Sequence, residues 1–371
     1  MALTSDSERI ERGGAAPTAR DDRFLIAYDD VILVTGATGF IGSRVVERLL
    51  DLGFRNVHCL TRPSSDLSNL AALSQRKEHG ARVEVVTGNL LSREDCVSMT
   101  ENAAVIIHLA AARGEKSFPD AFMNSVVTTR NLIEGALRHG CLSRFVNISS
   151  FSVYDNRGAN GVLDETCPIE QRPELRGEAY CFAKVKQDEI VAEYGKKFGV
   201  PYVIVRPGYV YGAGNEAISG RVGVGTFGVF VHLGGPNTIP LTYVENCADA
   251  IVLAGLVPGV DGEIFNVVDD QLPTSRQFLR LYKRRVRRFT SIYLPHFVSY
   301  GLCSFWEWYS SWSEEQLPAV FNRRRWYANW KKTRYSNEKL KARMGWSPRV
   351  STAEGMERYF EACRRKEARH A

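Results

Sequence analysis

Short apolar runs alternate with amphipathic stretches through the first half of the chain. The apolar runs are "VILV", "NVHCLT", "RVEVVTG", "AAVIIHLAA", "SRFVNISS" and "PYVIVRPG", and helical spacing is found near residues 90–101, 119–139 and 179–198. Apolar strands that are separated by helices are typical of a parallel sheet covered on both faces. The pattern therefore predicts an α/β fold with a doubly wound parallel sheet.

The pattern becomes less regular after residue 207. A glycine-rich stretch is followed by a helix near 246–256 and a strand "EIFNVV", and capping boxes at Thr274/Gln277 and Ser351/Glu354 predict two later helix starts. We expect a smaller substrate lobe over the carboxyl edge of the sheet, where such folds bind ligands. The predicted division is a loose polar tail (1–28), a dinucleotide-binding domain (29–206, joined by about 240–257) and the substrate lobe (207–239 and 258–371).

Three glycines interrupt the junction between the first strand and the first helix, in "VTGATGFIGSR". Gly36, Gly39 and Gly42 lack side chains, so the backbone turns tightly, approaches a pyrophosphate and packs helix against strand. A glycine pattern alone is a weak signal, but the flanking strand and helix supply the required context. The sequence therefore predicts a Rossmann site for a dinucleotide.

The end of the second strand indicates which dinucleotide binds. An acidic residue about 20 positions beyond the glycines binds the ribose 2′-hydroxyl of NAD, whereas a basic residue accommodates the 2′-phosphate of NADP. This chain has Arg62 there and no acid between Gly53 and Asp66. NADP is therefore favoured over NAD, the alternative being that Arg62 is an ordinary surface residue.

A serine, a tyrosine and a lysine supply candidate chemistry. Tyr180 and Lys184 in "YCFAK" lie on one face of a predicted helix, and Ser149 and Ser150 end the strand "VNISS" at the carboxyl edge of the sheet. A nearby cation lowers the pKa of a tyrosine toward neutral pH, which makes it an acid or base. Together the three residue types polarise a carbonyl, move a proton and tune that proton transfer.

These pieces together resemble the extended short-chain dehydrogenases/reductases, which include nucleotide-sugar epimerases and dehydratases and the 3β-hydroxysteroid dehydrogenases. The matching motifs are "TGATGFIG", "GNLL", "HLAA", "NISSFSVY", "YCFAK", "RPGYVYG", "PLTYVENCADAIVLA" and "EIFNVVDD", with "YSNEKLKARMGWSP" near the end. The resemblance implies Ser150, Tyr180 and Lys184 as catalytic residues, with Tyr180 as the acid/base. It implies a homodimer through the helix that carries Tyr180. It also implies cofactor binding by Gly36, Thr38, Gly39, Phe40, Ile41, Gly42, Arg62, Asn89, Leu90, Leu109, Ala110, Ala111, Asn124, Tyr180, Lys184 and Pro207.

The motifs narrow the reaction. Dehydratases of the family carry an Asp-Glu pair after the catalytic serine or threonine, and this chain has Phe151 and Ser152 there, which argues against dehydration. Asn89 also replaces the usual acid of the third-strand motif, so we expect weaker selection at the adenine. Two enzyme functions remain: an NAD(P)-dependent oxidoreductase, favoured by Arg62, and a nucleotide-sugar epimerase, favoured if Arg206, Arg221 and Arg276 hold a diphosphate. A non-catalytic NADP-binding sensor or scaffold is the third alternative, weakened by the intact catalytic trio.

Charge and composition indicate which partners and which compartment to expect. The net charge is +6, and thirteen basic residues lie between 276 and 334 against three acids. We interpret the aromatic, basic segment 280–330 either as the packed roof of a substrate pocket or as peripheral contact with an anionic membrane or a lipid-like substrate. No nucleic-acid-binding motif occurs. Eight scattered cysteines and a polar N-terminus predict a cytoplasmic protein with no disulfides and no metal. The family resemblance implies a small-molecule substrate.

Overall fold

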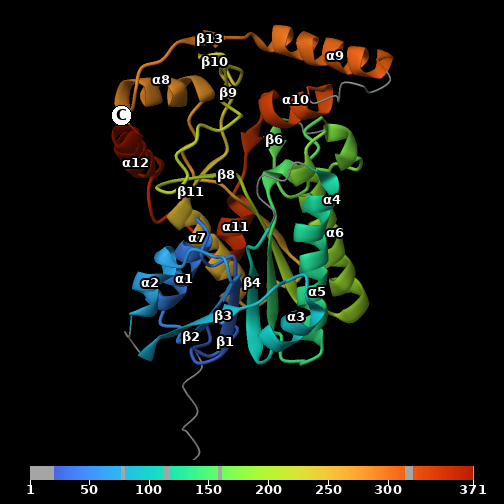
Figure 1. Cartoon of the computed structure of the whole chain (residues 1–371), viewed down its shortest axis with the longest axis vertical. Coiled ribbons are helices and arrows are strands. Elements are labelled where there is room, and N and C mark those ends of the chain that lie inside the picture. The colour runs from blue at the N-terminus through green and yellow to red at the C-terminus, as the bar shows by residue number, and fades with distance from the viewer. Residues whose placement is uncertain (1–20, 77–79, 112–116, 158–160, 314–320, 371) are drawn as a thin grey trace, which may run out of the picture.

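The computed structural model describes residues 21–76, 80–111, 117–157, 161–313 and 321–370. Within these ranges seven strands form one parallel sheet, in the order β12-β7-β5-β4-β1-β2-β3 (Figure 1). The order reverses between β1 and β4, which makes the sheet doubly wound and confirms the predicted fold class. The strands are β1 (Val31–Thr35), β2 (Asn56–Thr61), β3 (Arg82–Thr87), β4 (Ala103–His108), β5 (Arg144–Ile148), β7 (Tyr202–Pro207) and β12 (Ile264–Val267).

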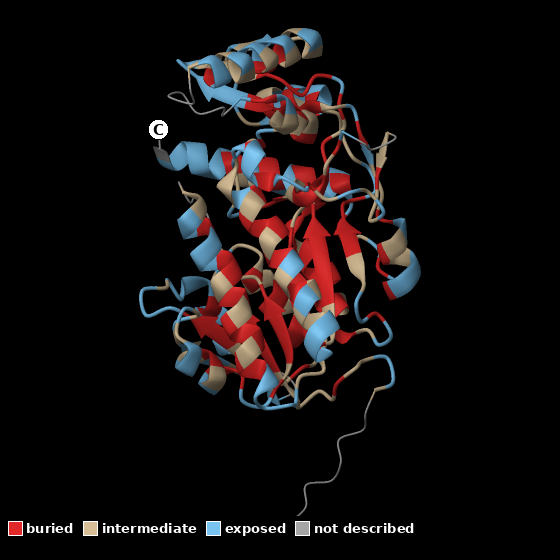
Figure 2. Ribbon diagram, turned by 90° about the vertical axis from the view of Figure 1, so that its right-hand side faces the viewer, coloured by how far each residue is buried: buried red, intermediate tan, exposed pale blue. Residues whose placement is uncertain are grey.

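Helices cover both faces of this sheet and create two separate apolar cores. Ile32 and Val34 of β1 belong to the core that includes α1 and α7, whereas Leu33 belongs to the core that includes α3, α5 and α6. This split follows from the strand period of two, which sends successive side chains to opposite faces. The buried residues lie along the sheet in Figure 2. The helices are α1 (Gly42–Asp51), α2 (Ser68–Ser74), α3 (Arg93–Met99), α5 (Thr128–Leu137), α6 (Ala179–Phe198) and α7 (Val244–Leu256).

The single helix predicted near 119–139 is divided in the structure. It consists of α4 (Phe118–Ala121), a π-helical segment η2 (Phe122–Val127) and α5. Hydroxyls at the end of the π segment bond to backbone carbonyls one turn back: Thr128 Oγ1 donates to the carbonyl of Asn124, and Thr129 Oγ1 to that of Ser125. π-Helical turns are frequent at functional sites, and this one lies against α6.

The late part of the chain forms smaller units above the sheet. A three-stranded sheet has the order β13-β10-β9, and β11 pairs with β8 and β14 with β6. The capping box of Thr274 and Gln277 opens α8 as predicted, and the Ser351 hydroxyl accepts from Glu354 N at the start of the last helix. The elements are β6 (Val162–Leu163), β8 (Tyr209–Tyr211), β9 (Gly223–Thr226), β10 (Val229–His232), β11 (Leu241–Tyr243), β13 (Ser291–Tyr293), β14 (Arg334–Tyr335), α8 (Ser275–Arg285), α9 (His296–Trp312), α10 (Arg323–Trp330), α11 (Glu338–Met344), α12 (Thr352–His370) and two 3-10 turns, η3 (Phe151–Val153) and η4 (Pro173–Arg176).

Candidate active site

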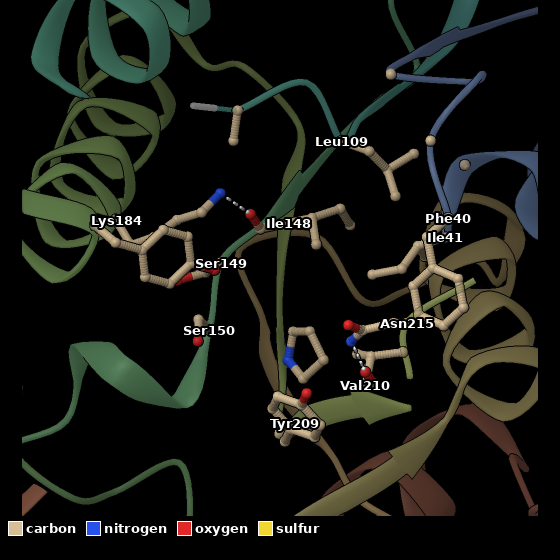
Figure 3. A pocket seen from close by; sticks show the side chains of 17 residues that line it. Phe40, Ile41, Leu109, Ile148, Ser149, Ser150, Lys184, Tyr209, Val210 and Asn215 are labelled. Carbon is tan, nitrogen blue, oxygen red and sulfur yellow. Dashed lines mark hydrogen bonds between the residues drawn. The ribbon is translucent and has the colours of Figure 1, made fainter. Parts of the chain in front are cut away.

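A cavity of about 470 Å³ opens at the carboxyl edge of the parallel sheet. Its walls come from the loop between β1 and α1, the residues after β4, the end of β5, the start of α6 and the segment after β7 (Figure 3). This edge is where doubly wound sheets bind ligands, at the point where the strand order reverses. Of the predicted site residues, the cavity brings together Gly36, Gly39, Phe40, Ile41, Gly42, Leu109, Ala111, Ser150, Tyr180, Lys184 and Pro207.

The glycine loop has the geometry that a pyrophosphate needs. Gly36 has a φ of +68°, and a Cβ there would lie 3.0 Å from Ala110 N. A Cβ on Gly42 would lie 2.1 Å from the Gly36 carbonyl oxygen, which excludes any side chain where α1 begins. The loop backbone is therefore open on the cavity side and pressed against β4 on the other, so these residues fit a dinucleotide.

Ser149 and Ser150 directly follow β5 but have different surroundings. Ser149 is buried, and its hydroxyl donates to Asp188 Oδ2 at 2.9 Å. Ser150 is half-buried, accepts a bond from Ser152 N at 3.2 Å and lines the cavity beside Tyr180. Both serines line this cavity, but Ser149 is buried with its hydroxyl committed to the Asp188 carboxylate, whereas Ser150 is the more accessible of the two.

Lys184 is a buried residue at the floor of the cavity. Its Nζ donates to the carbonyl of Ile148 at 2.6 Å, drawn in Figure 3, and to Gln187 Oε1 at 2.8 Å. Burial lowers the pKa of this lysine to about 8, opposed by the nearby Asp188 carboxylate. The ammonium is therefore charged at neutral pH and held at the last residue of β5, two positions before Ser150. Tyr180, one turn earlier on α6, is exposed within the cavity.

A chain of buried side chains links Lys184 to the far side of the cavity floor. Gln187 Nε2 donates to Thr129 Oγ1 at 2.8 Å, and His108 Nε2 lies 2.9 Å from the same oxygen. Because Thr129 gives its own proton to the Ser125 carbonyl, it accepts from both neighbours. His108 is therefore the neutral tautomer with the proton on Nε2.

The opposite ring nitrogen completes this chain. Nδ1 of His108 accepts from Thr35 Oγ1 at 2.8 Å, and Thr35 in turn accepts from Ala110 N at 3.0 Å. Burial lowers the pKa of His108 to about 3, with a contribution from the Lys184 charge. Each polar group in this chain therefore has a partner, and the chain connects the candidate catalytic lysine with the backbone behind the glycine loop.

Six predicted cofactor residues lie outside the cavity lining. Arg62 is exposed just after β2, and Thr38 lies in the glycine loop, where its carbonyl accepts from Asn69 Nδ2 at 2.9 Å. The side chain of Asn89 caps its own turn by accepting from Leu91 N. The remaining ones are Leu90 after β3, Ala110 after β4 and Asn124 in η2, whose Nδ2 donates to the Asp120 carbonyl.

Several lining residues were not predicted from the sequence. The segment "RPGYVYGAGN" contributes Gly208, Tyr209, Val210 and Asn215 to the cavity lining. Pro207 is the only residue of this segment that the sequence had assigned to cofactor binding. Asn215 Nδ2 donates to the Val210 carbonyl at 2.8 Å, which folds this segment over the cavity (Figure 3). The family-like motif was a usable signal, but the chain reversal that brings Asn215 back has no periodic signature.

A second cavity of about 480 Å³ adjoins the first and shares Ser150, Tyr180, Gly208 and Tyr209 with it. Arg221 and Arg325 line it, together with Asn329 of α10. The other two arginines named for a diphosphate do not line this cavity. Arg206 is buried in an ion pair with Asp188 at 3.0 Å, and Arg276 lies over the Tyr293 ring.

Fold and first cavity define an α/β protein with a Rossmann-type sheet and a glycine loop that fits a dinucleotide, and a second cavity adjoins the first. The family model of the NAD-dependent epimerase/dehydratase family matches residues 32–267, so the chain belongs to that family, part of the extended short-chain dehydrogenases/reductases. The match fits the glycine loop and the parallel sheet described above.

Relatives of this chain carry out several reactions. A trifunctional UDP-glucose 4,6-dehydratase/epimerase/reductase of Arabidopsis thaliana is 28% identical over 257 residues, 64% of this chain but only 36% of the plant protein. An uncharacterized UDP-glucose epimerase, YtcB, of Bacillus subtilis is 29% identical over 254 residues, 64% of this chain and 76% of that protein. A 3beta-hydroxysteroid-dehydrogenase/decarboxylase of Arabidopsis thaliana is 26% identical over 256 residues, 62% of this chain and 54% of that protein.

Solved structures share the fold over most of the chain. A UDP-glucuronic acid 4-epimerase from Bacillus cereus, in complex with UDP-glucuronic acid and NAD, has a TM-score of 0.67 at 21% identity and covers 90% of this chain and 99% of its own. The protein gox2253 has a TM-score of 0.73 at 22% identity and covers 92% of this chain and 99% of its own.

Proposed function

We propose that this protein is an NADP(H)-dependent oxidoreductase that acts on a hydroxyl or carbonyl group of a small molecule. The observation that carries the proposal is the sharing of Ser150 and Tyr180 by two adjoining cavities. The glycine loop lines only the first cavity, whereas arginines line the second. A substrate in the second cavity would therefore place its reacting carbon between the dinucleotide and the catalytic side chains.

Ser150, Tyr180 and Lys184 each have one role in this reaction. A bound nicotinamide dinucleotide supplies or takes up the hydride. In the reductive direction the Ser150 hydroxyl polarises the carbonyl, and the Tyr180 phenol gives its proton to the carbonyl oxygen, which leaves an alcohol. Lys184 is charged below a pKa of about 8, so it stabilises the resulting phenolate. In the oxidative direction the phenolate removes the hydroxyl proton.

Two features near β2 support NADP over NAD, although the family is named for NAD. Arg62 is exposed at the end of β2, and its backbone N–H donates to Ser65 Oγ at 3.0 Å in a tight turn. The nearest following acid, Asp66, accepts from Ser68 N at 2.9 Å at the start of α2. If the adenosine ribose binds at the end of β2, its charged neighbour there would be an arginine rather than a carboxylate, which suits a 2′-phosphate.

A nucleotide-sugar epimerase is the second candidate. It is supported by Arg221 and Arg325 in the second cavity, because two guanidinium groups suit a diphosphate. Both already have protein partners: Arg221 Nη1 donates to the Ala328 carbonyl at 2.8 Å, and Arg325 Nε pairs with Glu178 at 3.1 Å. An epimerase would keep its cofactor through each turnover, whereas an oxidoreductase exchanges it.

Cofactor titration and analysis of the retained ligand test the proposal. NADP(H) should bind more tightly than NAD(H) to the wild type, and Arg62→Ala should reduce that preference by about 10–100-fold, the value of a charge-assisted bond. Arg138→Ala, an exposed arginine at the end of α5, is the matched control and should leave the preference unchanged. Tightly held NAD that survives purification, with UDP-sugars interconverted and no net cofactor turnover, would establish the epimerase instead.

A further inference from the structure

Helix α9 turns its large apolar side chains away from the protein. Phe297, Phe305, Trp308 and Trp312 are 79%, 59%, 59% and 69% exposed. Their spacing of eight, three and four residues puts them on one side of the helix. We call these four residues the aromatic face. Figure 1 shows α9 lying along one end of the molecule, and Figure 2 shows it at that end from a second direction.

The opposite side of α9 packs on the protein with small residues. Ser299, Cys303 and Ser310 are buried there. Ser299 Oγ accepts from the indole Nε1 of Trp326 at 2.9 Å, and Cys303 joins an apolar cluster with Trp326 and Trp330 of α10. The inner side of α9 therefore combines these small residues with Tyr300, whose ring packs against Trp326, whereas the outer side carries the exposed aromatic face. Exposed apolar patches of this kind mark interaction sites.

A row of arginines lies on α8, the helix that precedes β13 and α9 in the chain. Arg276, Arg280 and Arg284 follow one another at intervals of four along α8, are exposed and have no ion pair within the described part of the chain. We call these three residues the arginine stripe. Its first member lies 5.3 Å from the ring of Tyr293, in the strand that leads into α9. Ile292 of that strand is 60% exposed.

The charges of this region favour an anionic occupant. The single acid of α9, Glu307, is paired with Arg323 at 2.8 Å, so it does not offset the arginine stripe. A second copy of the chain on the same face would add a second arginine stripe and would bring no unpaired acid of α9 to offset it. None of the described helices is long and apolar enough to cross a membrane, so contact would be parallel to the surface.

We propose that the aromatic face of α9 and the arginine stripe of α8 form a peripheral docking surface for an anionic lipid bilayer. The aromatic side chains enter the headgroup boundary, and the arginines contact anionic headgroups. Because α10 lies between α9 and the second cavity, docking would bring that cavity near the bilayer surface.

Co-sedimentation of the full chain with vesicles tests this surface. Wild-type protein should bind vesicles of phosphatidylcholine with phosphatidylglycerol at low salt, bind pure phosphatidylcholine weakly, and lose binding near 1 M salt, where the Debye length is about 3 Å. The double variant Phe305→Ser/Trp308→Ser should bind at least about tenfold more weakly, and so should Arg280→Gln/Arg284→Gln, since each basic residue contributes about 1 kcal/mol. Phe198→Ser removes an equally exposed aromatic (59%) from the end of α6 and should change nothing.

Three results would overturn the proposal. The first is wild-type protein that does not sediment with anionic vesicles at low salt. The second is Phe305→Ser/Trp308→Ser that sediments like the wild type. The third is a lipid-free dimer in sedimentation velocity that the same variant dissociates, without vesicle binding, which would assign the face to a second copy. Cofactor titration of every variant verifies that the fold is intact.

Discussion

The floor of the cavity and helix α9 place polar and apolar side chains in opposite ways. Beneath the cavity, His108, Gln187 and Lys184 are buried in positions that aliphatic residues would fill at lower desolvation cost. On α9, Phe297 and Trp308 lie in water, where polar residues would be more soluble. Both regions depart from the usual rule that apolar residues lie inside and polar residues outside.

The two departures are compensated differently. At the cavity floor the buried polar groups bond to one another, so these hydrogen bonds offset the free energy lost when the groups leave water. The aromatic face has no such compensation among the described residues, and its apolar area is covered only when something else binds. Buried polar groups that bond to one another indicate a site that holds a reactive group in place. Exposed apolar side chains that no part of the described chain covers indicate a surface for a partner.

The largest expected effect is on turnover, when a residue of the cavity is changed. Tyr180→Phe should lower turnover by about 10²–10⁴, because it removes the proton donor, and should leave cofactor affinity nearly unchanged. Tyr209→Phe is the matched control: that tyrosine lines the same cavity, but its hydroxyl donates to the Ala217 carbonyl at 2.8 Å. Steady-state kinetics and cofactor titration measure both. Equal losses in the two variants would remove Tyr180 from the mechanism.

The next effect separates buried from exposed tryptophans of the late lobe. Trp326→Ala should lower the free energy of unfolding by about 3–5 kcal/mol, since it opens a cavity and strips Ser299 of a partner. Trp308→Ala, on the aromatic face, should change it by about 0.5 kcal/mol or less. Urea unfolding of both variants gives the values. A cost above about 2 kcal/mol for Trp308→Ala would show that α9 packs on the protein by its aromatic side.

The two serines at the end of β5 provide a third contrast. Ser150→Ala should lower turnover by about 10²–10³, the cost of one polarising donor. Ser149→Ala should instead lower stability by about 1.5–3 kcal/mol, because it removes a hydroxyl bonded to the buried Asp188 carboxylate. Kinetics and urea unfolding are measured on both variants. If the roles are reversed, Ser149 is the catalytic serine and the motif alignment is displaced by one residue.

The sequence predicted those parts of the fold that follow from local periodicity. The apolar runs located the parallel strands, and the glycine spacing located the loop that the structure places at the cavity. Interactions between distant residues left no such signal. Arg206 was named for a diphosphate but is neutralised by Asp188, 18 residues earlier in the chain, and the π-helical turn at Asn124 has the same polarity pattern as an α-helix.

Helix α9 shows a second reason why the sequence does not predict every contact. Aromatic residues occupy much of the stretch from 297 to 312, so hydropathy cannot tell which side packs inward. The orientation of α9 depends on α10, because Trp326 and Trp330 of α10 pack against the side of α9 that carries Cys303. A pattern with apolar residues on both sides predicts a helix but not its orientation.

The smallest expected effect tests whether His108 stays neutral within its buried chain. Its pKa is about 3 in the folded protein and near 6.5 when unfolded, so the unfolded chain binds more protons between these values. Stability is therefore lost as the pH falls through this window, by about 2 kcal/mol at pH 5 relative to pH 7.5. His108→Gln retains a donor and an acceptor but cannot titrate, so it should lack this loss. The neighbouring Lys184, whose pKa is lowered to about 8, and His232, whose pKa is lowered to about 4, are present in both proteins, so their own titration is common to both. Urea unfolding at the two pH values measures the difference. Equal losses in wild type and variant would mean that His108 takes up a proton while folded, and that the chain from Lys184 to Thr35 contains a charged imidazolium rather than the neutral tautomer.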